Sequence, residues 1–428
     1  MKLIDIPSGM ETLAFAMSED AINDLPEVLS SFFPSKNPFL VADENTWRAA
    51  GIKVEKVLND SGVKISGKLI YSGSERLHPD YSISLELAEK FSTDDVPVAV
   101  GSGVINDIVK CASGKKGISY CCVPTAASVD GYTASGGAMS VDGTKMTVPC
   151  PAPAAVVAEL EVLRNAPPEM LASGYADLMT KVPAGADWII ADMMDEEKIS
   201  RPVWDLVQKN IRDCVSDSKN MLNVFSGLAA TGYAMQLHGT SRPASGLEHL
   251  CSHVWEMEHL SFNGTEISHG FKVGIGSLIS TLLMEYLLDT SAKDAEAKAA
   301  APETETERIN SINELLKKGC YGDKTMATAM AKFKQGDEIV KRRKEIFEKW
   351  EIFKEPVRKQ IIPYTQLKEM LKKANCPTHP AEIGLDREQL LHGVRCAQLI
   401  RIRYNIADLL YEAGLLDDAL KTLDILFE

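Results

Sequence analysis

Residues 96–132 read VPVAVGSGVINDIVKCASGKKGISYCCVPTAASVDGY. The run Val96–Val100 is apolar and rich in β-branched residues and ends at Gly101, which predicts a buried strand. Residues 105–111 follow at helical spacing, and residues 118–123 predict the next strand. Strand, helix and strand at this spacing are typical of βαβ units in a parallel sheet with helices on its faces.

The same alternation extends toward the N-terminus. The apolar run Phe39–Ala42 ends at Asp43, residues 46–58 have helical spacing, residues 68–71 predict a strand, and residues 85–91 predict a helix. We therefore expect the first third of the chain to be an α/β domain.

The second half has a different pattern. A Pro/Ala-rich stretch, Cys150–Val157, is typical of a domain boundary. Beyond it, apolar residues recur at helical spacing, as in the runs 204–215 and 395–416. We expect an α/β domain over residues 1–155 and an all-α domain over residues 156–428.

Charge and cysteine content restrict the class of protein. The chain has 428 residues, with 46 Lys and Arg against 60 Asp and Glu and a net charge of −14. So acidic a chain is a poor partner for nucleic acid or anionic membranes, and we expect neither. The N-terminal residues lack a secretory pattern, and residues 273–288 contain Glu285 and indicate a buried helix. Nine cysteines without a C-x-x-C pair indicate free thiols and a cytoplasmic location.

Two loops at the carboxyl ends of predicted strands carry polar groups or glycine. Gly101, Ser102, Gly103, Val104 and Ile105 open a helix, whose N–H groups could bind a phosphate, but a tight turn explains the same residues equally well. In the loop after the next strand, Thr125, Ser128 and Asp130 could hold a ligand, because open parallel sheets bind ligands at this edge. An ordinary loop with polar turns is the alternative.

Five of the eight histidines lie between residues 238 and 269. His249 and His253 are four residues apart, which places both rings on one helix face, and His269 follows twenty residues after His249. Two imidazoles and a carboxylate make a typical divalent-metal site, and Asp177, within an apolar helical pattern, is a candidate carboxylate. Solvated or core histidines and a capping or surface aspartate are the alternatives.

Together these segments resemble the iron-containing alcohol dehydrogenase superfamily and, within it, the bacterial glycerol-1-phosphate dehydrogenases. The resemblance runs over nearly the whole chain. The matching segments are VADENTW (Val41–Trp47), GSGVINDIVK (Gly101–Lys110), VPTAASVDGY (Val123–Tyr132), SGYADLMTK (Ser173–Lys181), SRPASGLEHLCSH (Ser241–His253), HGFKVGIG (His269–Gly276) and CPTHPAEIGLDREQL (Cys376–Leu390).

The resemblance implies an N-terminal dinucleotide-binding α/β domain and a C-terminal all-α metal-binding domain. Gly101–Ile105 would bind the pyrophosphate of NAD(P), and Thr125 and Ser128 would contact the cofactor. Asp43 would bind the adenosine ribose and favour NAD over NADP, because a carboxylate repels a 2′-phosphate. A cofactor-contacting serine expected four residues after Asp130 is replaced by Ala134, with Ser135 beside it. Ser102 also replaces the middle residue of a frequent Gly-Gly-Gly turn.

The resemblance also implies a metal centre. Asp177, His249 and His269 would ligate one divalent ion, and this ligand set suits zinc, nickel or iron. His253 and Asp130 would be the catalytic side chains that contact substrate. The residues assigned to substrate binding are Asp130, Asp177, His253 and, for a phosphate, Arg242 and Lys272.

The implied reaction is reversible hydride transfer between NAD(P) and dihydroxyacetone phosphate, which gives sn-glycerol 1-phosphate, in a homodimer. One alternative is a dehydrogenase of unphosphorylated polyols on the same fold. Another is the chemistry of dehydroquinate synthases, which use Glu as the first metal ligand, where this chain has Asp177. A third is a protein that binds the cofactor without catalysis.

Overall fold

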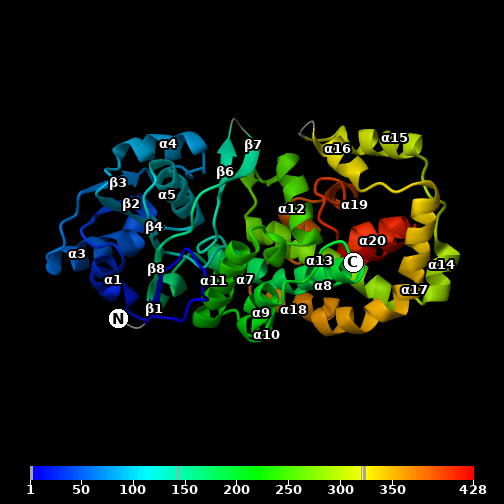
Figure 1. Ribbon diagram of the computed structural model, residues 1–428, viewed down its shortest axis with the longest axis horizontal. Coiled ribbons are helices and arrows are strands. Elements are labelled where there is room, and N and C mark those ends of the chain that lie inside the picture. The colour runs from blue at the N-terminus through cyan, green and yellow to red at the C-terminus, as the bar shows by residue number, and fades with distance from the viewer. Residues whose placement is uncertain (1–2, 142–143, 320, 322–323) are drawn as a thin grey trace. The chain divides into compact units, whose positions relative to one another are not determined.

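The computed structural model describes residues 3–141, 144–319, 321 and 324–428. Contacts between Cα atoms divide the chain into two compact units (Figure 1). Unit 1 consists of Met1–Leu178 and Arg212–Thr240, and unit 2 of Met179–Ile211 and Ser241–Glu428.

Unit 1 contains a parallel sheet of six strands in the order β1-β8-β5-β4-β2-β3. Its strands are β1 (Ala14–Ser18), β2 (Asn37–Asp43), β3 (Gly67–Tyr71), β4 (Asp95–Gly101), β5 (Cys121–Pro124) and β8 (Ala155–Glu159). Leu40 pairs with Val98, Val98 with Cys121, and Cys121 with Ala155. These side chains are fully buried, which explains the apolar runs in the middle of β2, β4, β5 and β8.

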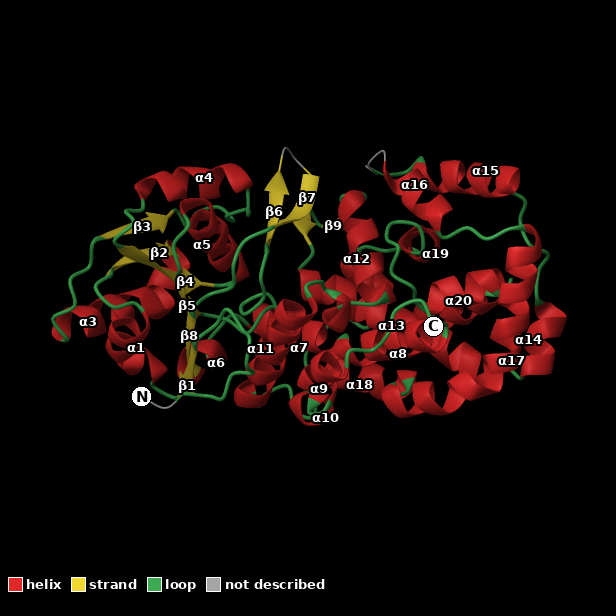
Figure 2. Ribbon diagram, in the orientation of Figure 1, coloured by secondary structure: helices red, strands yellow, loops and turns green. Residues whose placement is uncertain are grey.

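Helices cover both faces of this sheet (Figure 2). One face forms a core with α1 and α3, in which Leu25, Val28 and Val54 pack against strand residues such as Leu40 and Val98. On the other face, α5 packs against β4, and α4 packs against α5. The helices of unit 1 are α1 (Leu25–Phe32), α2 (Glu44–Thr46), α3 (Ile52–Asp60), α4 (Tyr81–Lys90), α5 (Gly103–Lys116), α6 (Leu160–Arg164), α7 (Pro168–Met179) and α11 (Met221–His238), with a π-turn at Trp47–Gly51. Helix α10 (Ile211–Cys214) spans the division between the units.

The parallel register brings the carboxyl ends of three strands to one edge of the sheet. Gly101 pairs with Pro124, and Val41 pairs with Ala99 two residues before Asp43 and Gly101. Because these strands all run in the same direction, Asp43, the Gly101 turn and the loop after Pro124 emerge at that edge. This is where ligands bind in open α/β sheets.

Unit 2 is almost entirely helical (Figure 2). Its helices are α8 (Lys181–Met193), α9 (Arg201–Gln208), α12 (Leu247–Met257), α13 (His269–Asp289), α14 (Ala292–Lys298), α15 (Glu305–Leu316), α16 (Lys324–Ala331), α17 (Gly336–Gln360), α18 (Tyr364–Lys373), α19 (Arg387–Ala397), α20 (Ile406–Glu412) and α21 (Leu416–Leu420). A two-stranded hairpin, β9 (Ser261–Phe262) and β10 (Thr265–Glu266), joins α12 to α13.

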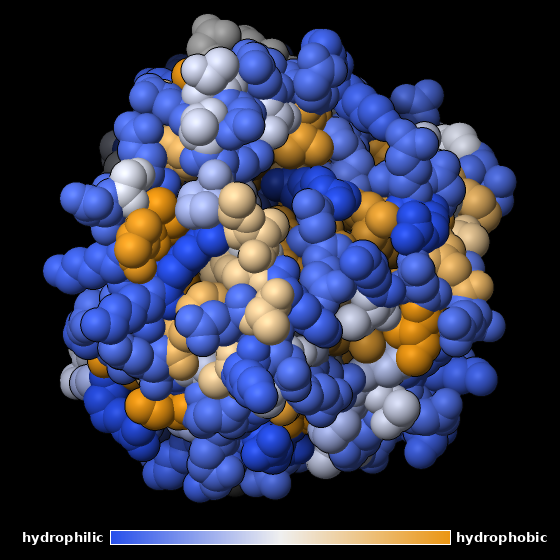
Figure 3. All heavy atoms as spheres, turned by 90° about the vertical axis from the view of Figure 1, so that its right-hand side faces the viewer, coloured by the Kyte–Doolittle hydropathy of each residue, from blue (hydrophilic) through white to orange (hydrophobic). Residues whose placement is uncertain are grey.

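Helix α13 is the central helix of unit 2 and packs against α12, α17 and α18. It is long and apolar enough to cross a membrane by length and composition alone, but 83% of its apolar window is buried inside the protein. This matches the expectation of a buried helix. The face drawn in Figure 3 is mostly hydrophilic with scattered apolar patches.

The predicted fold class is confirmed: a parallel α/β sheet is followed by a largely helical region. The expected boundary at residue 155 falls on the first residue of β8, which pairs with both β1 and β5, so the compact unit continues beyond it to Leu178. The sequence analysis also missed β1 and the hairpin of β6 (Gly137–Val141) and β7 (Thr144–Val148).

Two predicted long helices are interrupted. The run 204–215 contains the end of α9 and the separate short helix α10. In the run 395–416, α19 ends at Ala397 and α20 begins only at Ile406. Asn405 starts α20 with a capping box, in which its side chain accepts from the Ala407 N–H. An asparagine in this role favours a new helix start over continuation of the previous helix.

Candidate active site

The turn from β4 to α5 requires glycine at residue 101. A Cβ atom there would lie 2.4 Å from the Cβ of Ile105, so the turn closes only without a side chain. Ser102 has an extended conformation, and its side chain does not cap α5. The N-terminus of this 14-residue helix therefore keeps the positive end of its dipole without a cap from Ser102, which suits a phosphate.

The loop after β5 is held against this turn. The Thr125 N–H donates to the Gly101 carbonyl at 3.1 Å, and the side chains of Thr125 and Ser128 are buried. Lys110, fully buried on α5, donates to the carbonyls of Gly131 at 2.8 Å and Gly136 at 3.1 Å. The same helix that presents its N-terminus thus also fixes the loop that carries Asp130.

Asp43 has a local structural role at the end of β2. Its Oδ1 accepts from the backbone N–H groups of Asn45 and Thr46, both at 2.8 Å, in a capping box that starts α2. The carboxylate is therefore held at the carboxyl edge of the sheet. Ser135, which lies beside Ala134 and was expected near the cofactor, is exposed and donates to Glu11 at 3.1 Å.

Asp177 is fully buried on α7. Its Oδ2 accepts from the backbone N–H of Asp130 at 3.0 Å. One turn earlier, a Cβ atom at Gly174 would lie only 1.6 Å from the carbonyl oxygen of Ala127. Helix α7 therefore packs directly on the backbone of the loop after β5, and this close contact orients the aspartate.

His249 and His269 come together within unit 2. His249 lies in the first turn of α12 and His269 is the first residue of α13, and their ring centroids are 5.2 Å apart. The helices approach closely because a Cβ atom at Gly276 would lie 2.5 Å from the carbonyl oxygen of Glu248. The Nδ1 of His249 pairs with the buried Glu248 carboxylate at 2.9 Å, which leaves Nε2 as the ligand atom.

The start of α12 is itself anchored by Asp187 of α8. Its two carboxylate oxygens accept from the backbone N–H groups of Leu247 and Ile406, both at 2.8 Å. Burial, and then the charge of Glu248, raise the pKa of Asp187 to about 7. Asp187 thus fixes the turn of α12 that carries His249.

His253 lies one turn beyond His249 and is partly exposed. Its Nδ1 is 3.4 Å from Glu256, and the same carboxylate is 3.6 Å from Nδ1 of His269 and 2.8 Å from Nζ of Lys272. Burial lowers the pKa of His253 to about 4, against an opposing effect of Glu256, so the ring is neutral at pH 7.

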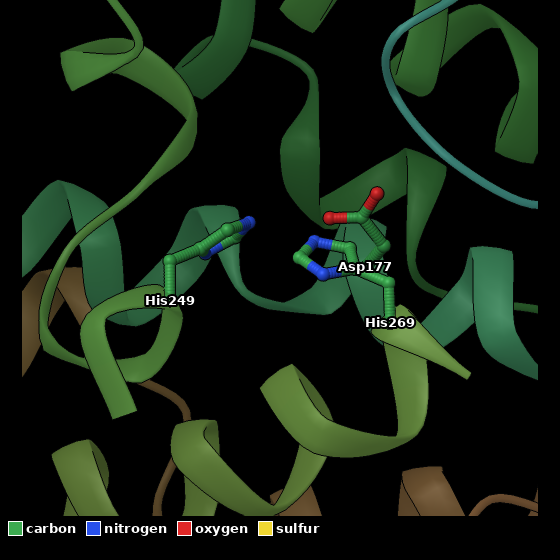
Figure 4. Close-up of side chains that lie close together, drawn as sticks. All are labelled: Asp177, His249 and His269. Atoms are coloured by element: carbon green, nitrogen blue, oxygen red, sulfur yellow. The ribbon is translucent and has the colours of Figure 1, made fainter. Parts of the chain in front are cut away.

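Figure 4 shows the rings of His249 and His269, which both belong to unit 2, and the carboxylate of Asp177 on α7. Each of the three side chains offers one atom that could bind a metal ion. A carboxylate oxygen and two imidazole nitrogens are a ligand set that suits one divalent ion, with room for a further ligand.

Both residues expected to bind a phosphate form hydrogen bonds or ion pairs with other groups of unit 2. Arg242 is 1% exposed, donates to the carbonyls of Tyr404 and Asp187, and pairs with Glu197 at 3.2 Å. Lys272 is 2% exposed and pairs with Glu256. These contacts give both cations a structural role inside unit 2.

Comparison with known proteins identifies the family. A family model described as iron-containing alcohol dehydrogenase matches residues 16–167. The chain is 32% identical to a glycerol-1-phosphate dehydrogenase [NAD(P)+] of Halalkalibacterium halodurans, over 62% of this chain and 69% of the relative. A protein of the same name from Bacillus subtilis is 33% identical, over 64% of this chain and 73% of the relative. The chain belongs to the iron-containing alcohol dehydrogenase family.

Solved structures support the fold of this iron-containing alcohol dehydrogenase family member. A glycerol dehydrogenase from Schizosaccharomyces pombe has a TM-score of 0.55 at 14% identity and covers 99% of this chain and 93% of its own. A sulfoacetaldehyde reductase from Bifidobacterium kashiwanohense, solved with NAD+, has a TM-score of 0.54 at 13% identity and covers 99% of both chains. At these identities the likeness concerns the fold.

The sequence analysis missed the residues that hold the site together. They are Lys110, Gly174, Asp187, Glu248 and Glu256. Spacing could have pointed to Glu256, which lies three residues after His253 on the same helix. For Lys110, Gly174 and Asp187 the signal is absent from local sequence, because their partners are 21 to 219 residues away or belong to another element.

Proposed function

We propose that this chain is an NAD(P)-linked dehydrogenase that interconverts dihydroxyacetone phosphate and sn-glycerol 1-phosphate. The observation that carries the proposal is the pair of His249 and His269, whose ring centroids lie 5.2 Å apart in unit 2, together with the buried carboxylate of Asp177, in a chain 32–34% identical to relatives of that name. A common fold alone would not distinguish this reaction from others, but the metal-type residues and the relatives support the same chemistry.

For the cofactor, the N-terminus of α5 would bind the pyrophosphate through backbone N–H groups from Gly103 onward. Thr125 and Ser128 lie in the adjoining loop, where hydroxyls would contact the nicotinamide half. Asp43, held by its capping contacts, would accept from the hydroxyls of the adenosine ribose. NAD is therefore the expected cofactor, with NADP as the less favoured one, and it supplies the hydride.

For the metal, Asp177, His249 and His269 would hold one divalent ion. Zinc, nickel and iron all suit these ligands, and such an ion polarises the substrate ketone oxygen and stabilises the developing alkoxide. Glu248 fixes the ring of His249, and the Asp130 N–H fixes the carboxylate of Asp177. These contacts orient the ligands before an ion binds.

For the proton, His253 is the best-placed side chain. It is partly exposed, sits one turn from His249, and is neutral at pH 7, so it could accept a proton from the substrate hydroxyl during oxidation and return it during reduction. Asp130 would hold a substrate hydroxyl. Its neighbour Gly131 accepts a hydrogen bond from Lys110, which fixes this part of the loop.

A second candidate is a dehydrogenase of unphosphorylated polyols. It is favoured by one observation: Arg242 and Lys272, the two expected phosphate ligands, are buried and paired internally. Reduction of dihydroxyacetone phosphate and of dihydroxyacetone by NADH, measured on one metal-loaded preparation, separates the candidates. The proposal predicts that kcat/KM is at least about 100-fold higher for the phosphorylated ketone, whereas equal values would favour the polyol enzyme.

We also propose that the enzyme is a cytoplasmic homodimer. None of the eight cysteines in the described part of the chain is joined in a disulfide bond, which supports a reducing compartment. The dimer follows from the family resemblance, and light scattering coupled to size-exclusion chromatography tests it. A mass of one chain at micromolar concentration would contradict it.

A further inference from the structure

A second cluster of ligand-type side chains lies in unit 2, apart from the residues described above. Glu258, at the C-terminal end of α12, faces His392 and Cys396 of α19. One ligand atom from each lies within 4.8 Å of the others. His392 Nε2 is 2.7 Å from Glu258 Oε1 and 3.5 Å from Cys396 Sγ. We propose that Glu258, His392 and Cys396 form a second metal site of the zinc class.

The pattern of contacts favours a metal site over a nucleophile relay. In a cysteine–histidine–carboxylate relay, the thiol and the carboxylate contact opposite nitrogens of the ring. Here both contact the same atom, Nε2 of His392. Three ligand atoms therefore converge on one region of space, as they do around an ion.

The chemistry of the ligands selects the ion. A thiolate, an imidazole and a carboxylate are all ligands of Zn²⁺, and the thiolate disfavours Mg²⁺ and Ca²⁺. Binding displaces to solvent the thiol proton of Cys396 and, where the His392 ring is doubly protonated, its Nε2 proton, so that the ring binds as a neutral imidazole. The charges of the ion, the thiolate and the carboxylate then sum to zero, which suits a site where Cys396 is fully buried and His392 is nearly so.

The surroundings pre-organise this site. His392 and Cys396 are four residues apart and share one face of α19. Helices α12 and α19 approach closely there, since a Cβ atom at Gly393 would lie 2.4 Å from Nε1 of Trp255. Tyr321 donates its hydroxyl to Glu258 Oε1 at 2.7 Å and orients the carboxylate. An ion would tie α19 to the end of the helix that carries His249, so its role would be structural.

Cobalt provides a specific test, because a Co²⁺–thiolate bond gives a charge-transfer band in the near ultraviolet. The ligands proposed for the active site contain no sulfur, so the band reports the second site alone. The full-length protein is stripped with a chelator and titrated with Co²⁺. We expect the band in the wild type and in the double variant His249→Ala/His269→Ala, and its loss in Cys396→Ser and in His392→Gln. Cys376→Ser, a change at another buried cysteine of unit 2, is the matched control and keeps the band.

Zinc content gives a second measurement. We expect two zinc ions per chain in the wild type and one in the His249→Ala/His269→Ala variant. Adding Cys396→Ser to that variant should lower its affinity for the remaining ion at least 100-fold. A wild type without the cobalt–thiolate band overturns the proposal whether or not the variants fold. A band that persists in a folded Cys396→Ser protein also overturns it. Because the double variant lacks the active-site histidines, neither result depends on the proposed activity.

Discussion

The backbone N–H of Asp130 donates to the carboxylate of Asp177 at 3.0 Å. This bond joins the loop after β5, which follows the proposed cofactor turn, to α7, which carries a proposed metal ligand. Gly174 makes the approach possible, because its hydrogen faces the carbonyl of Ala127 where any side chain would collide. The cofactor edge of the sheet and the metal ligand of α7 are thus built as one unit.

The two histidines of α12 have different expected roles. His249→Ala removes a metal ligand, so metal affinity and turnover should fall together by about 100-fold or more. His253→Ala should keep its metal within a few-fold while turnover falls about 10²–10⁴-fold, because it removes a proton carrier. Metal analysis and steady-state kinetics on the same samples test this, with exposed His78→Ala as the control. Metal content and turnover that are unchanged in both variants would show that neither histidine has the role assigned to it.

Gly174→Ala should destabilise unit 1. The new methyl group would lie 1.6 Å from the Ala127 carbonyl, so the loop or the helix must shift, at a cost of about 1–3 kcal/mol that exceeds the gain in helix propensity. Urea unfolding measures the loss. Gly131→Ala, in the same loop but with no atom near the added Cβ, should change stability by less than about 0.5 kcal/mol. Equal stability of the two variants would show that α7 does not pack on the loop as described.

Asp43 should decide the choice of cofactor. Asp43→Ser keeps an oxygen for the N-cap of α2 but removes the charge that repels a 2′-phosphate. We expect the ratio of kcat/KM for NADP to that for NAD to rise about tenfold or more, which is about 1.4 kcal/mol. Asp43→Gly should shift the ratio in the same direction at a small cost in stability. An unchanged ratio in both variants would exclude contact between this carboxylate and the ribose.

Asp187 should make stability depend on pH. Burial and Glu248 raise its pKa to about 7 in the folded protein, whereas the unfolded chain titrates near 3.8. Between these two pH values the folded state holds a proton that the unfolded state has lost. The free energy of unfolding therefore falls as the pH rises from about 4 to 7, by at most about 4 kcal/mol. Above pH 7 this contribution no longer changes with pH. Asp187→Asn should flatten this slope, measured from urea midpoints between pH 5 and 7.5. If the stability of the wild type and that of Asp187→Asn change with pH in the same way, the proton taken up on folding does not belong to Asp187.

Much of the fold was predictable because its signals are local. The strands β2, β3 and β4 are apolar runs bounded by turn residues, and each was predicted within a few residues. Strand β8 was missed because its residues follow a Pro/Ala-rich stretch that is typical of a linker. Only its pairing with β1 and β5, which are distant in sequence, makes it a strand.

The site was predictable in part for the same reason. The spacing of His249, His253 and His269 is visible in the sequence, and the packing of α12 on α13 brings the rings of His249 and His269 together within unit 2. The structure pairs Arg242 with Glu197 and Lys272 with Glu256, and charge in a sequence does not reveal which cations are buried against internal carboxylates. Glu248 and Glu256, which hold the histidines, act through contacts that appear only when α12 and α13 are packed.

The most direct test of the central claim is oxidation of the two enantiomers of glycerol phosphate by NAD on a preparation with measured metal content. The account predicts turnover of sn-glycerol 1-phosphate that rises with metal occupancy and a rate at least about 100-fold lower for sn-glycerol 3-phosphate. Equal rates with the enantiomers, or turnover that is unchanged when the metal is removed, would contradict it.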